Sequence, residues 1–103
     1  MTTAVAKVVA ALLADPTADR YGLELLRATG LPSGTLYPLL ERLQRAGWVE
    51  AHWEQLDPVA AGRPARRYYR LTADGAATAR SELAALYQQL GPVQQPSTRP
   101  RPA

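Results

Sequence analysis

The feature that most constrains this sequence is a change of hydrophobic period at Gly47. From Ser33 to Ala46 leucines recur at steps of three and four residues, the spacing of one buried helical face. These leucines are Leu36, Leu39, Leu40 and Leu43. From Trp48 to Glu54 apolar and polar residues alternate, which indicates a strand. The chain is therefore expected to combine helices with a small amount of sheet.

Two amphipathic helices are expected before this segment. The first spans Thr3 to Ala14, with Thr3 as its cap. The second begins at Arg20 or Tyr21 and ends at Thr29, where Gly30 can close it. The cap of the third helix stays open between Leu31, Pro32 and Ser33, and Pro38 is expected to bend its first turn.

A hairpin and one more helix are expected after it. The second strand runs from Arg67 to Leu71, across a loop that contains Pro58, Gly62 and Pro64. Thr72 then caps a fourth helix that ends at Gly91. Its apolar residues follow the spacing of a coiled-coil seam and are Ala76, Ala79, Leu83, Leu86 and Leu90.

Three helices, a hairpin and a further helix follow one another in a winged helix-turn-helix, where the third helix enters the major groove of DNA. The expected fold is therefore mainly α with a small β-hairpin (α+β): three helices, a two-stranded wing and a C-terminal dimerisation helix. Residues 1–91 form this domain, and the Pro-, Gln- and Arg-rich residues 92–103 are expected to be disordered.

The composition argues against several classes of function. The chain has no cysteine and a single histidine, His52, which excludes disulfides and zinc-thiolate sites, so no metal or cofactor is expected. No nucleophile, base and orienting acid converge, so an enzyme is not expected. No signal peptide or membrane-length apolar run is present, which predicts a cytoplasmic protein. The net charge is +3, and all but one of the twelve basic residues are arginine, which suits phosphate and guanine.

Three segments carry a family resemblance. They are YGLELL at Tyr21–Leu26, SGTLYPLLERLQRAGWVE at Ser33–Glu50 and GRPARRYYRLTADG at Gly62–Gly75. On them the chain resembles the PadR family of bacterial transcriptional regulators, and it looks like the short subfamily with one terminal helix. The resemblance implies a dimer built from the first and last helices, a DNA contact centred on the third helix, and a repressor.

Candidate DNA contacts fall in two places. At the start of the third helix, the amides of Ser33, Gly34 and Thr35 can attract phosphate. Along that helix Tyr37 can reach a phosphate, Pro38 a thymine methyl, and Arg42 and Arg45 a guanine or a phosphate. Alternatively, Tyr37 packs beneath the wing and the two arginines are merely solvated.

In the wing, three arginines are candidates for phosphate contacts, namely Arg63, Arg66 and Arg67. Arg70 can instead pair with Glu50 across the hairpin. The expected partner is a pseudo-palindromic double-stranded operator bound by a homodimer.

The dimer interface is expected to combine the first helix with the seam of the last. Its candidate residues are Val5, Val8, Leu12, Ala79, Leu83, Leu86 and Leu90. The alternative is that the seam is core, although Leu26, Leu36, Leu40 and Leu43 can close a core without it. Trp48, Trp53 and Tyr87 could line a pocket for an unidentified small-molecule inducer at this interface. A winged helix used as a protein-interaction module and a small-molecule sensor are the alternative functions.

Overall fold

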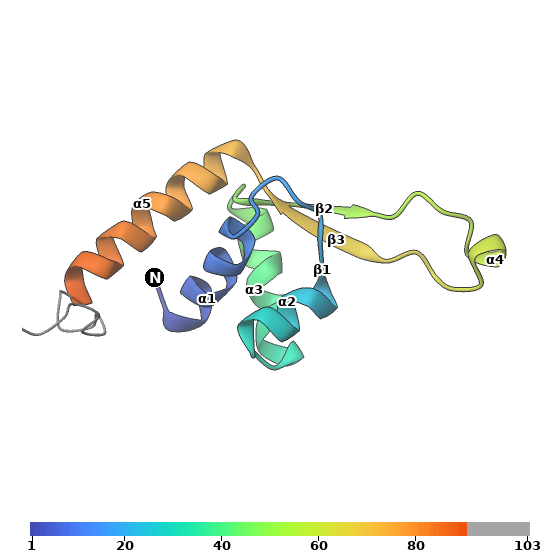
Figure 1. Cartoon of the computed structure of the whole chain (residues 1–103), viewed down its shortest axis with the longest axis horizontal. Helices are drawn as coiled ribbons and strands as arrows, with labels where there is room; N and C mark the ends of the chain where they lie inside the picture. The colour runs from blue at the N-terminus through green and yellow to red at the C-terminus, as the bar shows by residue number, and fades with distance from the viewer. Residues whose placement is uncertain (91–103) are drawn as a thin grey trace, which may run out of the picture.

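The computed structural model describes residues 1–90 as a helical body from which a wing and a long helix extend in opposite directions (Figure 1). Its elements in chain order are α1 (Thr3–Leu13), β1 (Arg20–Tyr21), α2 (Gly22–Thr29), α3 (Ser33–Arg45), β2 (Val49–Trp53), α4 (Pro58–Ala61), β3 (Arg67–Leu71) and α5 (Ala73–Leu90). The expected winged-helix order is confirmed. The proposed tail, residues 92–103, and the end of its domain at Gly91 lie outside the described residues.

The core forms where α1, α2 and α3 meet. Its most deeply buried side chains are Val8, Val9, Leu12, Leu25, Leu36 and Leu40. Each such aliphatic side chain contributes about 1.5–3 kcal/mol on leaving water. The helical leucine stripe of α3 therefore faces inward, as its spacing predicts, and the opposite face of α3 is left to solvent.

The sheet has three strands rather than the expected two. Arg20 and Tyr21, expected to open the second helix, form β1 and pair with Tyr69 and Tyr68 of β3. The strand order is β1-β3-β2, with both pairs antiparallel. A two-residue strand has too little sequence to show a period of two, so only the tertiary pairing reveals it.

The tip of the wing contains a short helix, α4, where a plain loop was expected. The Asp57 carboxylate accepts a hydrogen bond from the amide of Val59 at 3.0 Å and so caps this turn. Gly62 ends it with a φ of 70°, in the left-handed region that glycine adopts without strain.

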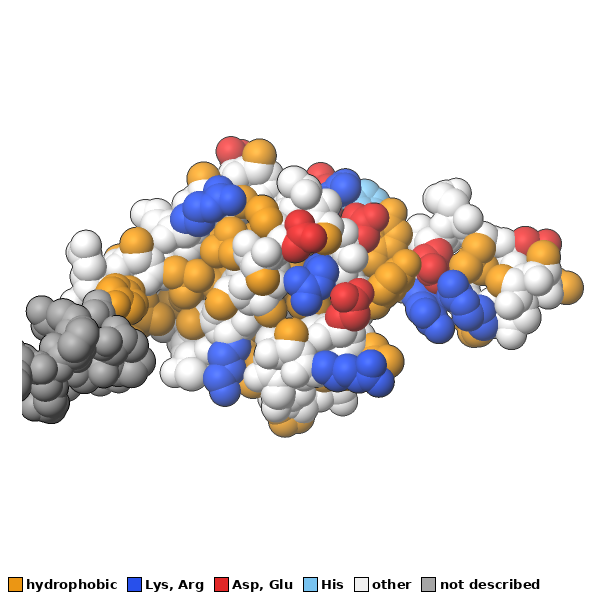
Figure 2. All heavy atoms as spheres, in the orientation of Figure 1, with side chains coloured by type: hydrophobic (Ala, Val, Ile, Leu, Met, Phe, Trp, Pro, Cys, Tyr) orange, Lys and Arg blue, Asp and Glu red, His pale blue; other side chains and the backbone are white. Residues whose placement is uncertain are grey.

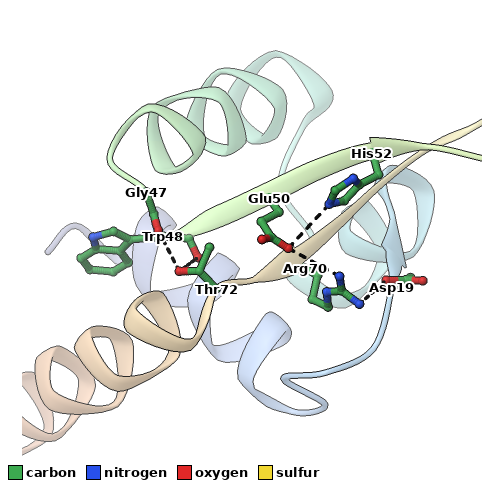
Figure 3. Close-up of polar contacts among 7 residues, drawn as sticks. All are labelled: Asp19, Gly47, Trp48, Glu50, His52, Arg70 and Thr72. Carbon is green, nitrogen blue, oxygen red and sulfur yellow. Dashed lines mark hydrogen bonds and ion pairs between the residues drawn. The ribbon is translucent and has the colours of Figure 1, made fainter.

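A tight junction joins α3, β2 and α5 (Figure 3). Thr72 Oγ1 accepts from the amide of Gly75 at 2.8 Å, which confirms Thr72 as the cap of α5, and donates to the carbonyl of Gly47 at 2.8 Å. A Cβ on Gly75 would lie 2.7 Å from the carbonyl carbon of Trp48. Thr72 and Gly75 thus fix where α5 leaves the sheet.

Two other caps are now defined. Thr2, not Thr3, caps α1, because its hydroxyl accepts from the amide of Val5 at 3.2 Å. Pro32 occupies the cap position of α3 and offers no side-chain acceptor. Within the described residues, none of the helices combines the length and the apolarity that crossing a bilayer requires.

Candidate nucleic-acid interface

The outer face of α3 presents the residues expected at its N-terminus. Ser33, Gly34 and Thr35 are all exposed, as is Pro38 one turn later. The amide of Thr35 bonds to the carbonyl of Pro32, so Ser33 and Gly34 carry the first amides of the helix, and no side chain caps them. Because Pro38 has no N–H, the carbonyl of Gly34 lacks its usual helical partner. This end of α3 is open to an anionic or polar ligand.

A groove of about 580 Å³ separates α3 from β3. It is lined by Tyr37, Glu41, Gln44, Arg45, Arg67 and Tyr69. Tyr37, Arg45 and Arg67 were expected at the DNA surface from the sequence, whereas Glu41 and Gln44 were not. Their positions four and seven residues after Tyr37 place them on one helical face, a signal that the sequence already contained. The groove thus joins the outer face of α3 to the wing.

Tyr37 is seated against the start of α2. A Cβ on Gly22 would lie 2.8 Å from Cε1 of Tyr37, so only glycine leaves room for this ring. The ring is nonetheless 41% exposed. Tyr37 therefore packs against α2 and still exposes part of its ring to solvent. The two alternatives expected for it, a phosphate contact and packing within the fold, do not exclude each other.

A second cavity, of about 240 Å³, lies where α2 begins. Its lining is Tyr21, Gly22, Leu23, Tyr37, Arg66, Arg67 and Tyr69. The positive end of the α2 dipole and two arginines meet here. Tyr37 and Arg67 line this cavity and the larger groove, so the two are neighbouring parts of one surface.

Glu54 organises the base of the wing. Its carboxylate accepts two hydrogen bonds from the Arg63 guanidinium, at 2.7 and 3.2 Å, and one from the amide of Arg66 at 2.8 Å. The Tyr21 hydroxyl donates a further bond at 3.1 Å. The bonds from Arg63, aided by those from Arg66 and Tyr21, hold the pKa of Glu54 at about 2, well below its ordinary value. Glu54 in turn raises the pKa of Arg63.

The wing arginines consequently have different roles. Arg63 is engaged by Glu54, which neutralises its charge locally. Within residues 1–90, the ion pairs include neither Arg66 nor Arg67. The Arg67 guanidinium lies 5.2 Å from the centroid of the Trp53 ring, a cation–π distance. Arg66 and Arg67 are therefore the wing cations that remain available to phosphate.

Arg70 belongs to a polar ladder on the solvent side of the sheet (Figure 3). It lies opposite Glu50 and pairs with this carboxylate at 3.5 Å, which confirms the expected cross-strand pair. It also pairs with Asp19 at 3.5 Å, while His52 lies 3.6 Å from Glu50. Arg70 thus ties the sheet to the turn before β1.

Arg42 lines a different groove from Arg45. This groove of about 360 Å³ is formed by Met1, Val5, Leu39, Arg42, Leu43, Ala46, Trp48 and Glu82. Residues 42 and 45 lie only about 60° apart around a helix, but the two side chains line grooves on either side of the outer face of α3. The structure brings Arg45 to the groove beside the wing and Arg42 to the side that faces α1 and α5.

The residues expected in a dimer interface separate into two groups. Val8, Leu12 and Ala79 are buried inside the single chain, at 0%, 1% and 0% exposure, and serve its core. Leu90 is 49% exposed, and Val5, Leu83 and Leu86 are half-buried. The first half of the apolar stripe of α5 is thus core, and the second half extends beyond the body.

The three aromatic residues expected to line one pocket are not brought together in the chain. Trp48 precedes β2 and Trp53 ends it, which separates them by about 16 Å along an extended strand. Tyr87 lies near the far end of α5 and is 51% exposed. Trp53, at the end of β2, is 56% exposed.

Comparison with solved structures supports the fold. A PadR-like transcription factor from Bacteroides fragilis is similar with a TM-score of 0.67 and 24% identity, over 86% of this chain and 84% of that one. A PadR family transcription regulator from Clostridium difficile gives a TM-score of 0.66 and 20% identity, over 91% of this chain and 100% of that one. BpsR of Bordetella bronchiseptica, whose DNA binding is regulated by 6-hydroxynicotinic acid, gives 0.72 and 20%, over 97% of this chain and 65% of that one.

Comparison with proteins of curated function gives no match. The profile of the transcriptional regulator PadR-like family, however, matches residues 11–81, well over half of the chain. The matched range contains all three resemblance segments in full, and it leaves out most of α1 and the end of α5. The chain therefore belongs to the PadR-like family of transcriptional regulators, as a DNA-binding winged-helix protein and not an enzyme.

Proposed function

We propose that the protein is a homodimeric repressor that inserts α3 of each subunit into the major groove of a pseudo-palindromic operator. The observation that carries this proposal is the continuity of one surface: the outer face of α3, the start of α2 and the cations Arg66 and Arg67 line two neighbouring grooves. Base-reading and phosphate-binding groups are thereby adjacent, as sequence-specific binding requires.

Each part of this surface has a separate task in the proposal. The free amides of Ser33 and Gly34, with the Thr35 hydroxyl, bind a phosphate at the start of α3. Tyr37 and Pro38 contact the backbone and a thymine methyl, and Arg45 contacts a base edge. Arg66 and Arg67 hold a flanking phosphate. Arg63, which is paired with Glu54, and Arg42, which lines the groove beside α1 and α5, make no direct contact in this proposal.

The second subunit is proposed to pack on the outer half of α5. The apolar stripe continues through Leu83, at the margin of the core, to Leu86 and Leu90, and Val5 of α1 lines the groove that reaches Glu82. Figure 2 shows apolar side chains along this end of the molecule. A mutual packing of two such helices would bury the stripe and set the spacing of the two copies of α3.

Selection from a random pool of duplex DNA tests the proposal. We expect an enriched pseudo-palindrome whose half-sites are centred about 10 base pairs, one helical turn, apart. Placed over a promoter in a reporter strain, this site should lower transcription when the protein is expressed. A protein that enriches no sequence, and that binds no duplex even at low ionic strength, would contradict it.

A second candidate function, sensing of a small molecule, is favoured by the groove between α1, α3 and α5. Its volume of about 360 Å³ falls within the range of ligand sites, and it offers an indole, a cation and a carboxylate from Trp48, Arg42 and Glu82. A Trp53→Phe variant leaves Trp48 as the single tryptophan, whose emission can be excited selectively. Quenching of its emission by a compound that also releases DNA would support this function, and the absence of both effects across candidate effectors would contradict it.

A further inference from the structure

The recognition surface contains one carboxylate. Glu41 is the single acidic residue of α3, and among the residues that line the groove between α3 and β3 it is again the only acid. Its side chain is 62% exposed, on the side of α3 that faces away from the core. DNA carries one negative charge per about 1.7 Å of duplex, so a carboxylate here repels every duplex regardless of sequence.

Glu41 is paired with an arginine of the same face. Its Oε1 accepts a hydrogen bond from a terminal nitrogen of Arg45 at 2.7 Å. The side chain of Arg45 is 72% exposed, so both partners are open to solvent. Exposed pairs one helical turn apart contribute little to stability, and stabilisation of α3 is a weak reason for a carboxylate at this place.

The pair has the hydrogen-bonding pattern of a reader for one base pair. A guanidinium has five N–H donors, so Arg45 keeps a free donor pair after its bond to Glu41. In the major groove a G·C pair presents two acceptors on guanine, N7 and O6, followed by one donor, the cytosine N4 amino group. A donor pair beside a carboxylate oxygen is complementary to this order.

We propose that Glu41 is a specificity-determining residue, which accepts a hydrogen bond from cytosine N4 while it holds Arg45 on the guanine of the same pair. This inference rests on the proposed insertion of α3 into the major groove. Glu41 discriminates between DNA sequences in two ways. Its hydrogen bond strengthens binding to sites with a G·C pair at one position of each half-site, and its repulsion of the phosphates weakens binding to all other DNA.

The test compares the wild type with Glu41→Gln in selection from a random duplex pool. Glutamine keeps the size of the side chain and removes its charge. We expect the wild type to fix one G·C position in each half-site, and E41Q to relax the preference at that position by about tenfold while the other positions stay unchanged. Affinity of E41Q for unrelated duplex should rise several-fold at low salt.

Asp15→Asn provides the matched control. Asp15 is an exposed carboxylate in the turn after α1, outside the lining of both grooves beside the wing, so the variant makes the same change of net charge elsewhere. It should leave the selected motif unchanged and raise affinity for unrelated duplex less than E41Q does. An equal rise in both variants would overturn the local role of the carboxylate.

Three further outcomes separate this inference from the proposed function. If the wild type selects a pseudo-palindrome and E41Q selects the same bases with equal strength, the role of Glu41 is overturned and the function stands. If E41Q only lowers the melting temperature, the pair serves helix stability and the inference is likewise overturned. If the wild type selects nothing, the proposed function itself has failed.

A double-mutant cycle combines Glu41→Gln with Arg45→Ala. Non-additive losses of base preference would support the action of Glu41 and Arg45 as one unit.

Discussion

At the residue scale, small side chains set the closest approaches in this molecule. Gly75 lies in the first turn of α5 directly against the carbonyl of Trp48, and Gly22 lies against the ring of Tyr37. Gly34 is also helical, yet a Cβ added there would meet no atom within 4 Å. These glycines look alike in the sequence, but only the first two are required by packing.

Replacement of Gly75 by alanine should therefore destabilise the protein. The added methyl group would collide with backbone, which cannot rotate away, and overpacking of this kind costs about 1–3 kcal/mol. The free energy of unfolding in urea measures it. Gly34→Ala is the matched control and should leave stability unchanged or raise it by up to about 1 kcal/mol. Equal effects at both positions would contradict the close contact at Trp48.

Glu54 gives a second prediction at this scale, on pH. Its folded pKa of about 2 lies below the unfolded value of about 4.3, so the stabilisation from its ionised form is complete above the unfolded value and is lost as the pH falls toward 2. The ¹³C carboxyl shift of Glu54 should titrate near pH 2.

In Glu54→Gln, amide exchange across residues 54–66 should become faster. Glu50→Gln, on β2 just before Glu54, should not have this effect, and an ordinary pKa for Glu54 would contradict the network.

At the scale of elements, the wing is held by side-chain bonds at its base more than by its tip. β2 and β3 end at Trp53 and Arg67, and the bonds of Glu54 to Arg63 and Arg66 extend the order beyond the strands. The wing projects away from the helices (Figure 1). Its two available cations, Arg66 and Arg67, lie at the base, beside the grooves.

Removal of these two cations should weaken binding to all DNA sequences. In Arg66→Ala/Arg67→Ala, affinity for the selected operator and for unrelated duplex should fall together, and the slope of log K against log salt should flatten by about 2, since each phosphate contact contributes about 0.9. Fluorescence anisotropy at several salt concentrations measures this. Arg80→Ala, on α5, is the control and should keep the wild-type slope. An unchanged slope in the double variant would remove the wing from the proposal.

At the scale of the whole molecule, the two ends of the described chain have different tasks. The wing and the outer face of α3 carry the cations and polar groups of the proposed DNA surface, and α5 extends the other way with exposed apolar side chains (Figures 1 and 2). α5 packs on α1 through Ala76 and Ala79, which are buried. On its outer half, within residues 1–90, Leu83 and Leu86 are only half-buried and Leu90 is 49% exposed.

A charge on this outer half should separate the proposed dimer. Leu86→Glu would place a carboxylate in the centre of an apolar interface, where an unpaired charge is costly, without reaching the core of the single chain. Light scattering after size-exclusion chromatography should then give the monomer mass, and operator affinity should fall. Ser81→Glu, on the exposed side of the same helix, is the control. A wild type that is already monomeric would contradict the dimer.

Much of the architecture was predictable because it depends on local periodicity. The leucine spacing of α3, the alternation of β3 and the cap at Thr72 are properties of neighbouring residues, and each is confirmed within a residue or two. The pairing of Glu50 with Arg70 followed from strand register alone. The family resemblance rests on the same segments.

Tertiary contacts decided what local sequence could not. Strand β1 exists because Tyr21 lies beside β3, Arg63 is engaged because Glu54 folds back on it, and Ala79 belongs to the core because α5 packs on α1. The same holds for Arg42 and Arg45, which point to different grooves. The sequence determines which side chains are apolar or charged. Their contact partners come from segments that are distant in the chain, and only the folded structure brings such segments together.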